Sequence, residues 1–262
     1  MAKWTAFPHD TSGFAGDAAS LKKLWPRLHV GDAEPWPAEA AVVEAWRLFH
    51  GGEFQKAAEA GLKAAKGGAS GGLTVANKAQ SVYATYLEQS EKTKLALLLE
   101  VAERAEARTR EDPKDAAAHY NMAYALGRYS QGISIAKALA QGLGSKVKSA
   151  LETTIELQPK HADAHAALGS FHAEVVDKVG SLLARTQGAS KDAGLAAYRQ
   201  SVKLAPQSAI ILVEYANGLV MLEGEKRIKE ATALYEQAAA TKPMDAMETL
   251  DVEMAKAELE DE

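Results

Sequence analysis

The sequence predicts an all-α protein built from stacked helical hairpins, and three observations support this. Hydrophobic residues make up 47% of the 262 residues but aromatic ones only 6%, and alanine is abundant. Small, strong helix formers at this density suit helices that pack closely face to face. Four prolines recur along the chain, and each closes a helix-like stretch. An alanine-rich helical segment then resumes a few residues after each proline.

The prolines divide the second half of the chain into similar units. Proline cannot continue a helix, and it disfavours helical geometry in the residue before it. Asp115 and Ser208 each follow two residues after a proline, where the next helix needs an N-cap acceptor. The prolines are Pro113, Pro159, Pro206 and Pro243. Their spacings are 159−113 = 46, 206−159 = 47 and 243−206 = 37 residues.

The repeated units resemble the tetratricopeptide repeat, whose pattern is W-x2-L-G-x2-Y, then A-x3-F, then P. The unit that ends at the third proline fits best, and weaker versions begin at His119 and Leu212. Its matching residues are His165, Leu168, Gly169, His172, Gly194, Tyr198 and Pro206. The resemblance covers roughly residues 38–245. It implies a right-handed α-α superhelical solenoid of tetratricopeptide-like hairpins, in which small residues at the Leu-Gly positions allow the helices to approach closely.

Two units are longer than the usual repeat of 34 residues. The excess lies within residues 131–146 and 174–194, and both stretches contain an apolar, helix-like segment flanked by glycine and lysine. We therefore expect inserted helices there. This long-repeat pattern is similar to bacterial and eukaryotic proteins related to regulators of microtubule dynamics. It is also similar to the tetratricopeptide proteins associated with tripartite (TRAP) substrate transporters.

The sequence divides into an N-terminal arm at 1–37, a solenoid at 38–245, and a C-terminal capping helix with an acidic tail at 246–262. All four tryptophans lie in the first 46 residues. We expect the aromatic-rich arm either to cap the first hairpins or to occupy the binding groove, since solenoids need their apolar ends covered. The segment GGASGG at 67–72 is expected to be a flexible loop between hairpins.

Composition disfavours several functions. The formal net charge is −5 and no basic stripe is visible, which argues against nucleic-acid binding. Cysteine is absent, so disulfides, thiolate zinc sites and cysteine nucleophiles are excluded. No apolar run approaches the roughly 20 residues of a membrane span. With no signal-peptide pattern at the N-terminus, we expect a cytoplasmic protein.

Motifs for catalysis or metal binding are weak. His161, His165 and His172 with Asp163 could suggest zinc, but two of these histidines occupy positions where the repeat pattern places packing aromatics. The segment GLGSK at 142–146 lacks the second glycine and the order of a phosphate-binding loop. Nucleophile elbows, H-E-x-x-H pairs and dinucleotide-binding glycine runs are absent. We therefore predict no enzyme activity, no cofactor and no metal.

The resemblance also implies a binding groove, lined by the second, fifth, sixth and ninth positions of each first helix. Its polar and aromatic members suit an extended peptide, because tyrosine combines apolar area with a polar tip and asparagine pairs with backbone amides. The predicted groove residues are Tyr120, Asn121, Tyr124, Asp163, Ser170, Glu214 and Asn217. Alternatively, Tyr120 and Tyr124 pack against the first inserted helix. No groove position is basic, which argues against clamping a chaperone's C-terminal carboxylate.

We therefore expect a non-catalytic scaffold that binds a protein or peptide partner in its concave groove. The alternative is a small-molecule-binding protein whose pocket is closed by the inserted helices, motivated by the excess of 46−34 = 12 and 47−34 = 13 residues. Such a ligand would need a cavity of about 300 Å³ or more. Attachment to an acidic cytoskeletal filament fits the acidic chain poorly.

Overall fold

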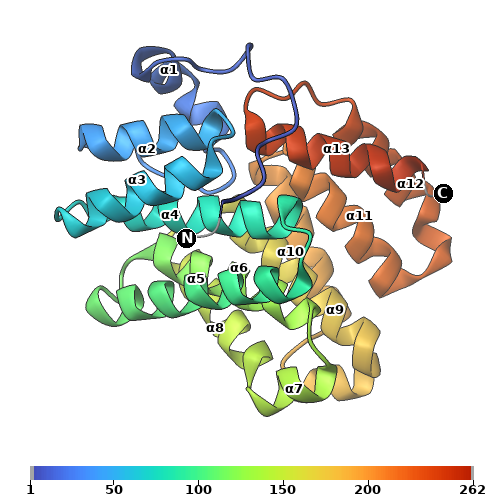
Figure 1. The fold of residues 1–262 in the computed structure, drawn as a ribbon. Helices are drawn as coiled ribbons and strands as arrows, with labels where there is room; N and C mark the ends of the chain where they lie inside the picture. Colours follow the sequence, from blue (N-terminus) through green and yellow to red (C-terminus); the bar gives the residue numbers. More distant parts are fainter. Residues whose placement is uncertain (1–2, 261–262) are drawn as a thin grey trace. The chain divides into compact units, whose positions relative to one another are not determined.

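The computed structural model describes residues 3–260, which form α-helices and two short helical turns without any strand (Figure 1). The predicted all-α class is therefore confirmed. Two compact units are present. Unit 1 comprises the described residues up to His29 together with Glu34–Leu143 and Met244–Met247. Unit 2 comprises Val30–Ala33, Gly144–Pro243 and the described residues from Glu248 onward.

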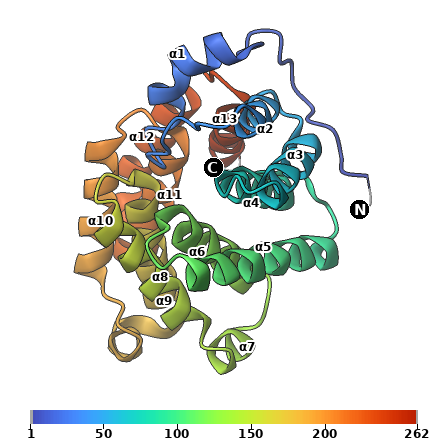
Figure 2. The same ribbon diagram turned by 90° about the vertical axis from the view of Figure 1, so that its left-hand side faces the viewer.

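Unit 1 is a succession of neighbouring helices, in which α2 packs on α3, α3 on α4, α4 on α5 and α5 on α6 (Figures 1 and 2). The π-helical turn η1 extends α4. The elements are α1 (Ala18–Leu28), α2 (Ala40–His50), α3 (Phe54–Lys66), α4 (Gly71–Val82), η1 (Tyr83–Leu87), α5 (Glu91–Glu111), α6 (Ala116–Gln131) and α7 (Ile135–Ala140).

Unit 2 repeats the scheme, with α9 packed on α10, α10 on α11 and α11 on α12. A core of small and aromatic side chains joins α11, α12 and α13, and Tyr235 and Val252 are among its members. The elements are α8 (Leu143–Leu157), α9 (Ala162–Thr186), α10 (Lys191–Leu204), α11 (Ala209–Glu223), η2 (Glu225–Arg227), α12 (Ile228–Ala239) and α13 (Ala246–Glu260).

The prediction that the four prolines close helices is confirmed, because all four lie in loops between helices. Asp115 is the N-cap of α6, and its Oδ1 accepts the backbone N–H of Ala118 at 2.9 Å. Ser208 is the N-cap residue of α11, but its side chain makes no capping hydrogen bond. The sequence thus located both helix starts, although only one of the two predicted caps forms its bond.

Both long repeats carry extra helix, as predicted, but in different forms. The first insertion forms the separate helix α7. The second lengthens α9, which bends at Gly180, where φ is 77° and ψ is 155°. A positive φ is accessible to glycine at little cost, so this residue lets the chain turn and resume a helix. The segment after the bend reaches Thr186.

The glycine-rich segment at 67–72 is a loop only as far as residue 70, because Gly71 and Gly72 begin α4. A Cβ atom on Gly72 would lie 2.3 Å from the carbonyl oxygen of Gly61 on α3. The reverse substitution at Gly61 would place a Cβ atom 2.5 Å from the carbonyl oxygen of Gly72. These glycines therefore allow close helix contact, which the composition of the segment does not reveal.

The predicted C-terminal helix is present as α13, and it packs against the core. Leu250, Val252 and Ala255 are buried, and Asp251 is buried with them. The acidic composition of the segment does not reveal this packing, in which Val252 and Ala255 belong to the core shared with α11 and α12.

Candidate functional site

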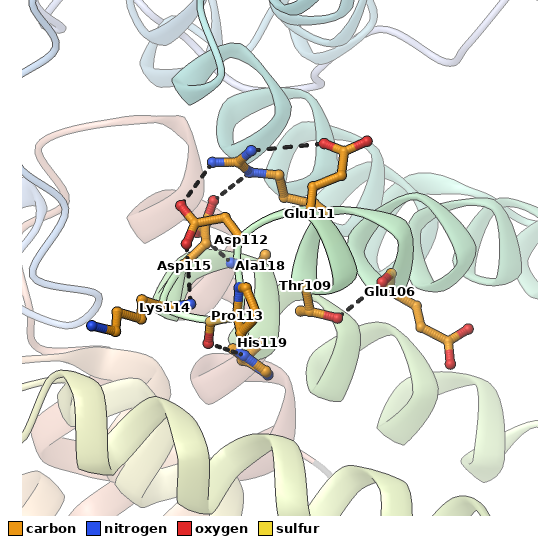
Figure 3. A network of polar contacts seen from close by, with 10 residues as sticks. Glu106, Thr109, Glu111, Asp112, Pro113, Lys114, Asp115, Ala118 and His119 are labelled. Atoms are coloured by element: carbon orange, nitrogen blue, oxygen red, sulfur yellow. Dashed lines mark hydrogen bonds and ion pairs between the residues drawn. The ribbon is translucent and has the colours of Figure 1, made fainter.

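In unit 1 the candidate site lies on α6, whose entry is fixed by a polar network that includes Asp112, Asp115 and His119 (Figure 3). Arg108 donates from Nε to Asp115 Oδ2 at 2.8 Å and from Nη2 to Asp112 Oδ2 at 3.1 Å. The hydrogen bond to Asp115 is the main cause that raises the pKa of Arg108. Nε2 of His119 lies 3.0 Å from the Pro113 carbonyl oxygen. The network joins the end of α5 to the first turn of α6 and so sets the direction of α6.

Beyond this entry, α6 presents two half-buried tyrosines. The ring centroids of Tyr120 and Tyr124 are 6.2 Å apart. The Tyr124 hydroxyl donates to Thr85 Oγ1 at 3.3 Å, and the Arg128 guanidinium lies 5.4 Å from the centre of the Tyr124 ring. Asn121, on the same helix, is only 5% exposed, so it offers a partner little surface.

In unit 2 the predicted residues Ser170 and Glu214 meet through a hydrogen-bonded chain. The Ser170 hydroxyl donates to Glu214 Oε2 at 2.7 Å, and the Tyr198 hydroxyl donates to Ser170 Oγ at 3.0 Å. The Tyr198 ring stacks on Tyr215 with centroids 5.3 Å apart. Tyr198 thus links α10 to both α9 and α11. The repeat pattern predicts a packing aromatic at this position but does not predict its hydrogen bond.

Two glycines allow this arrangement, Gly169 at the Leu-Gly position of its repeat and Gly218 on α11. A Cβ atom on Gly169 would lie 2.8 Å from the Tyr198 ring, and one on Gly218 would lie 2.2 Å from it. Both glycines leave room for the tyrosine between α9 and α11, as the sequence pattern predicts for Gly169.

The two remaining predicted residues in unit 2 are also engaged. Asn217 Oδ1 accepts the Tyr235 hydroxyl at 2.5 Å. The backbone N–H of Asp163 donates to the Gly31 carbonyl at 3.0 Å, and a Cβ atom on Gly31 would lie 2.4 Å from Asp163 Oδ1. Part of the predicted N-terminal arm therefore covers the first turn of α9.

The predicted groove residues thus form two groups, one on α6 in unit 1 and one on α9 and α11 in unit 2. Six of the seven keep partly exposed surface, with Asn121 the exception. Sequence reasoning missed Arg128 and Thr85, which border Tyr124. An arginine one helical turn after a groove tyrosine is the signal that could have identified Arg128.

The three histidines considered for metal have separate structural roles. Nδ1 of His161 accepts the backbone N–H of Ala164 at 3.1 Å as the cap of α9, and His165 Nε2 lies 3.1 Å from the Pro159 carbonyl oxygen. His172 is buried, and its Nδ1 accepts the Ser190 N–H at 3.3 Å. Burial, helped by the nearby charge of Lys148, lowers the pKa of His172. Across residues 3–260 no group of three histidine or acidic side chains could hold a metal ion.

A half-buried cation, Arg104, lies between α4 and α5. Arg104 donates to Asn77 Oδ1 at 2.6 Å and to Gln80 Oε1 at 2.8 Å. Burial lowers the pKa of Arg104. Glu100 joins this network, because Gln80 donates to Glu100 Oε2 at 2.9 Å. Further along α5, Arg110 Nη2 and Glu106 Oε2 form an ion pair at 3.1 Å.

The hairpins and their small-residue contacts define an all-α protein of the tetratricopeptide type. The structure is similar to the crystal structure of TTC0263, a thermophilic tetratricopeptide protein of Thermus thermophilus. The TM-score is 0.59 at 17% sequence identity, and the match covers 83% of this chain and 97% of that chain. At this identity the likeness shows the fold alone.

The family is shown by the sequence. The family described as regulator of microtubule dynamics protein 1-3 matches residues 43–261, and the chain belongs to this family. No curated protein sequence matches the chain. Along residues 3–260, none of the helices has the length and apolar character needed to cross a membrane.

Proposed function

We propose that the protein is a non-catalytic scaffold that binds a protein or peptide partner on the exposed face of the first helix of its hairpins. The observation that carries this proposal is the face of α6, where Tyr120 and Tyr124 keep exposed surface beside Arg128. Tyrosine and arginine are the residue types that most often dominate binding energy at protein interfaces. The tetratricopeptide fold and the family support the same class of function.

The unit 2 group is proposed as a second contact surface. Ser170, Glu214 and Asn217 are held by hydrogen bonds to neighbouring helices, so their positions are set before a partner arrives. Fixed polar groups lower the entropy cost of binding.

The alternative of a small-molecule pocket closed by the inserts has less support. A helix that roofs an apolar pocket buries its large side chains, since apolar lining is what binds such ligands. No residue of α7 is buried, and Ile135 and Leu139 are 47% and 54% exposed. After the bend in α9, Leu182 and Leu183 are 79% and 59% exposed.

The proposal is tested by affinity capture from the native extract, comparing wild type with a Tyr120→Ala/Tyr124→Ala variant. We expect the variant to lose at least about tenfold of the captured partner, because hot-spot residues each contribute on the order of 2 kcal/mol. An Arg110→Ala variant is the matched control, since Arg110 is exposed and pairs with Glu106 on α5. Equal capture by all three proteins, with unchanged melting curves, would refute the α6 surface.

A further inference from the structure

The N-terminal segment of unit 1 attaches to the helices through two aromatic side chains. Residues 3–10 form neither helix nor strand. Trp4 is 8% exposed and Phe7 is half-buried, whereas Lys3, Thr5, Ala6 and Pro8 are exposed. The segment therefore lies on the surface in the manner of a short bound peptide, with an anchor at one position and a second anchor three residues later.

Trp4 is held by both its ring and the adjoining backbone. Its ring stacks on Tyr83 of η1, with centroids 4.3 Å apart and planes 9° from parallel. The Trp4 backbone N–H donates to Gln55 Oε1 at 2.9 Å, and the next N–H, of Thr5, donates to the Tyr83 hydroxyl at 3.3 Å. The two backbone bonds do not depend on the side chains of the segment, so they are available to any extended peptide.

Phe7 is seated on the turn between α2 and α3. A Cβ atom on Gly52 would lie 2.8 Å from the Phe7 ring, and the edge of the ring meets Phe54 with centroids 6.1 Å apart. Gly52 has a φ of 81°, so its backbone geometry also favours glycine. Because Gly52 has no side chain, this turn leaves space for the aromatic ring of Phe7.

Two carboxylates adjoin this surface. Glu59 accepts from Gln55 at 3.2 Å, and Glu88 accepts from the Tyr83 hydroxyl at 2.9 Å. Both glutamates therefore adjoin the two side chains that bond the backbone of the segment. Basic residues beside the aromatic anchors complement this charge, and Lys3 directly precedes Trp4 in the chain's own segment.

The attachment is also local. Nothing lies within 4 Å of a Cβ atom built on Gly13 or Gly16, and these glycines separate the anchors from α1. A glycine-containing connection can bend without cost to side-chain packing. Residues 3–10 can therefore leave the surface while α1 stays in place.

We propose that the surface formed by Gly52, Phe54, Gln55 and Tyr83, hereafter the arm site, is a peptide-binding site that the chain's own N-terminal segment occupies. Its partner is an extended segment of another protein, with aromatic residues at positions i and i+3 and a basic residue beside them. The N-terminal segment is then an internal competitor. The arm site shares no residue with the α6 face, and its test uses a different peptide and different variants, so either proposal can fail without the other.

The test uses a labelled peptide of the chain's first twelve residues, MAKWTAFPHDTS, and measures its fluorescence polarisation. The receptor is the full chain carrying Trp4→Ala and Phe7→Ala, which empties the arm site. We expect saturable binding to this variant and at least about tenfold weaker binding to wild type, because a tethered segment competes at an effective concentration near millimolar. The same peptide with both aromatics replaced by alanine should not bind.

Two further variants keep the result interpretable. Phe14→Ala changes a half-buried arm residue outside the anchors, and this protein should bind the peptide as weakly as wild type does. Adding Gln55→Ala to the emptied receptor should weaken peptide binding several-fold, because it removes the acceptor of the first backbone bond.

The proposal is overturned if the emptied receptor melts cooperatively yet shows no saturable binding, or if wild type and the emptied receptor bind equally. Light scattering at the same protein concentrations gives a third outcome. A wild-type dimer that dissociates on Trp4→Ala/Phe7→Ala substitution would assign the site to the arm of a second copy, which overturns the assignment to a different protein.

Discussion

Single residues set the closest contacts in unit 2, and glycine is the decisive type. Tyr198 lies between Gly169 and Gly218, so the ring contacts helix backbones that any side chain would push away. A well-packed interior tolerates added volume poorly because its density matches that of organic crystals. The tyrosine and its glycines therefore behave as one unit, and substitution at either glycine tests the packing directly.

We predict that Gly218→Ala destabilises the protein by about 1–3 kcal/mol, the usual effect of overpacking. The added Cβ atom would lie 2.2 Å from the Tyr198 ring, so the ring must move. Gly127→Ala on α6 is the control, since nothing lies within 4 Å of its Cβ position. Alanine should stabilise that helix by about 0.5–1 kcal/mol. Urea unfolding of both variants gives the comparison, and similar stabilities would contradict the packing argument.

The buried imidazole of His172 makes stability depend on pH. Its pKa is lowered in the folded state by burial, so the unfolded chain takes up the proton more readily. Stability from this group is present above the unfolded pKa of about 6.5 and is lost as the pH falls through and below that value. We expect wild type to lose more stability than His172→Asn between pH 7.5 and pH 5.5. Parallel losses in urea unfolding would refute the assignment.

At the scale of elements, local chemistry predicts where helices start and stop, but not how they pair. The prolines and Asp115 predicted the helix ends correctly, because their effects act within a few residues. Gly61 and Gly72 carried no such signal, since their role depends on two helices meeting. Similarly, neither Trp4 nor Phe7 reveals from sequence that it would dock on Tyr83 and Gly52. For this reason the repeat predicted the groove positions, while the arm site became visible only in the structure.

The two predicted N-caps provide a matched test at this scale. Asp115→Ala should destabilise the protein by about 1–2 kcal/mol, because it removes a formed cap bond and the acceptor of Arg108. Ser208→Ala should cost well under about 1 kcal/mol, since no side-chain cap bond is lost. Thermal melts followed by circular dichroism measure both. A larger loss for Ser208→Ala would show that cap geometry does not govern these helix starts.

At the scale of the whole molecule, each unit contains chain from both ends of the sequence. Unit 2 includes Val30–Ala33, where the Ala33 carbonyl accepts from Gln158 at 2.9 Å. Unit 1 includes Met244–Met247, where Asp245 Oδ2 lies 2.5 Å from His50 Nδ1 and both side chains are buried. His50 Nε2 lies 3.1 Å from His29 Nε2. His50 and Asp245 are 195 residues apart in the sequence, so local spacing cannot predict their contact.

We predict that Asp245→Ala destabilises unit 1 by about 1–3 kcal/mol, because it leaves a buried imidazole without its partner. All four tryptophans lie before residue 47, in unit 1, so tryptophan fluorescence reports the unfolding of this unit. The fluorescence transition should move to lower urea concentration. An exposed neighbour, Lys242→Ala, is the control, and an equal shift in both variants would contradict the role of the buried pair.

The exchange of end segments between the units bears on how the chain can be shortened. In a repeat protein each repeat contacts only its neighbours, so a truncation usually disturbs only the repeat beside the cut. Here a fragment that stops before residue 244 lacks Asp245, which contacts His50 in unit 1. A fragment that starts after residue 33 removes the partner of Gln158. Deletion mapping of a binding partner would therefore report lost folding as lost contact, and point substitutions are the sound way to map this protein.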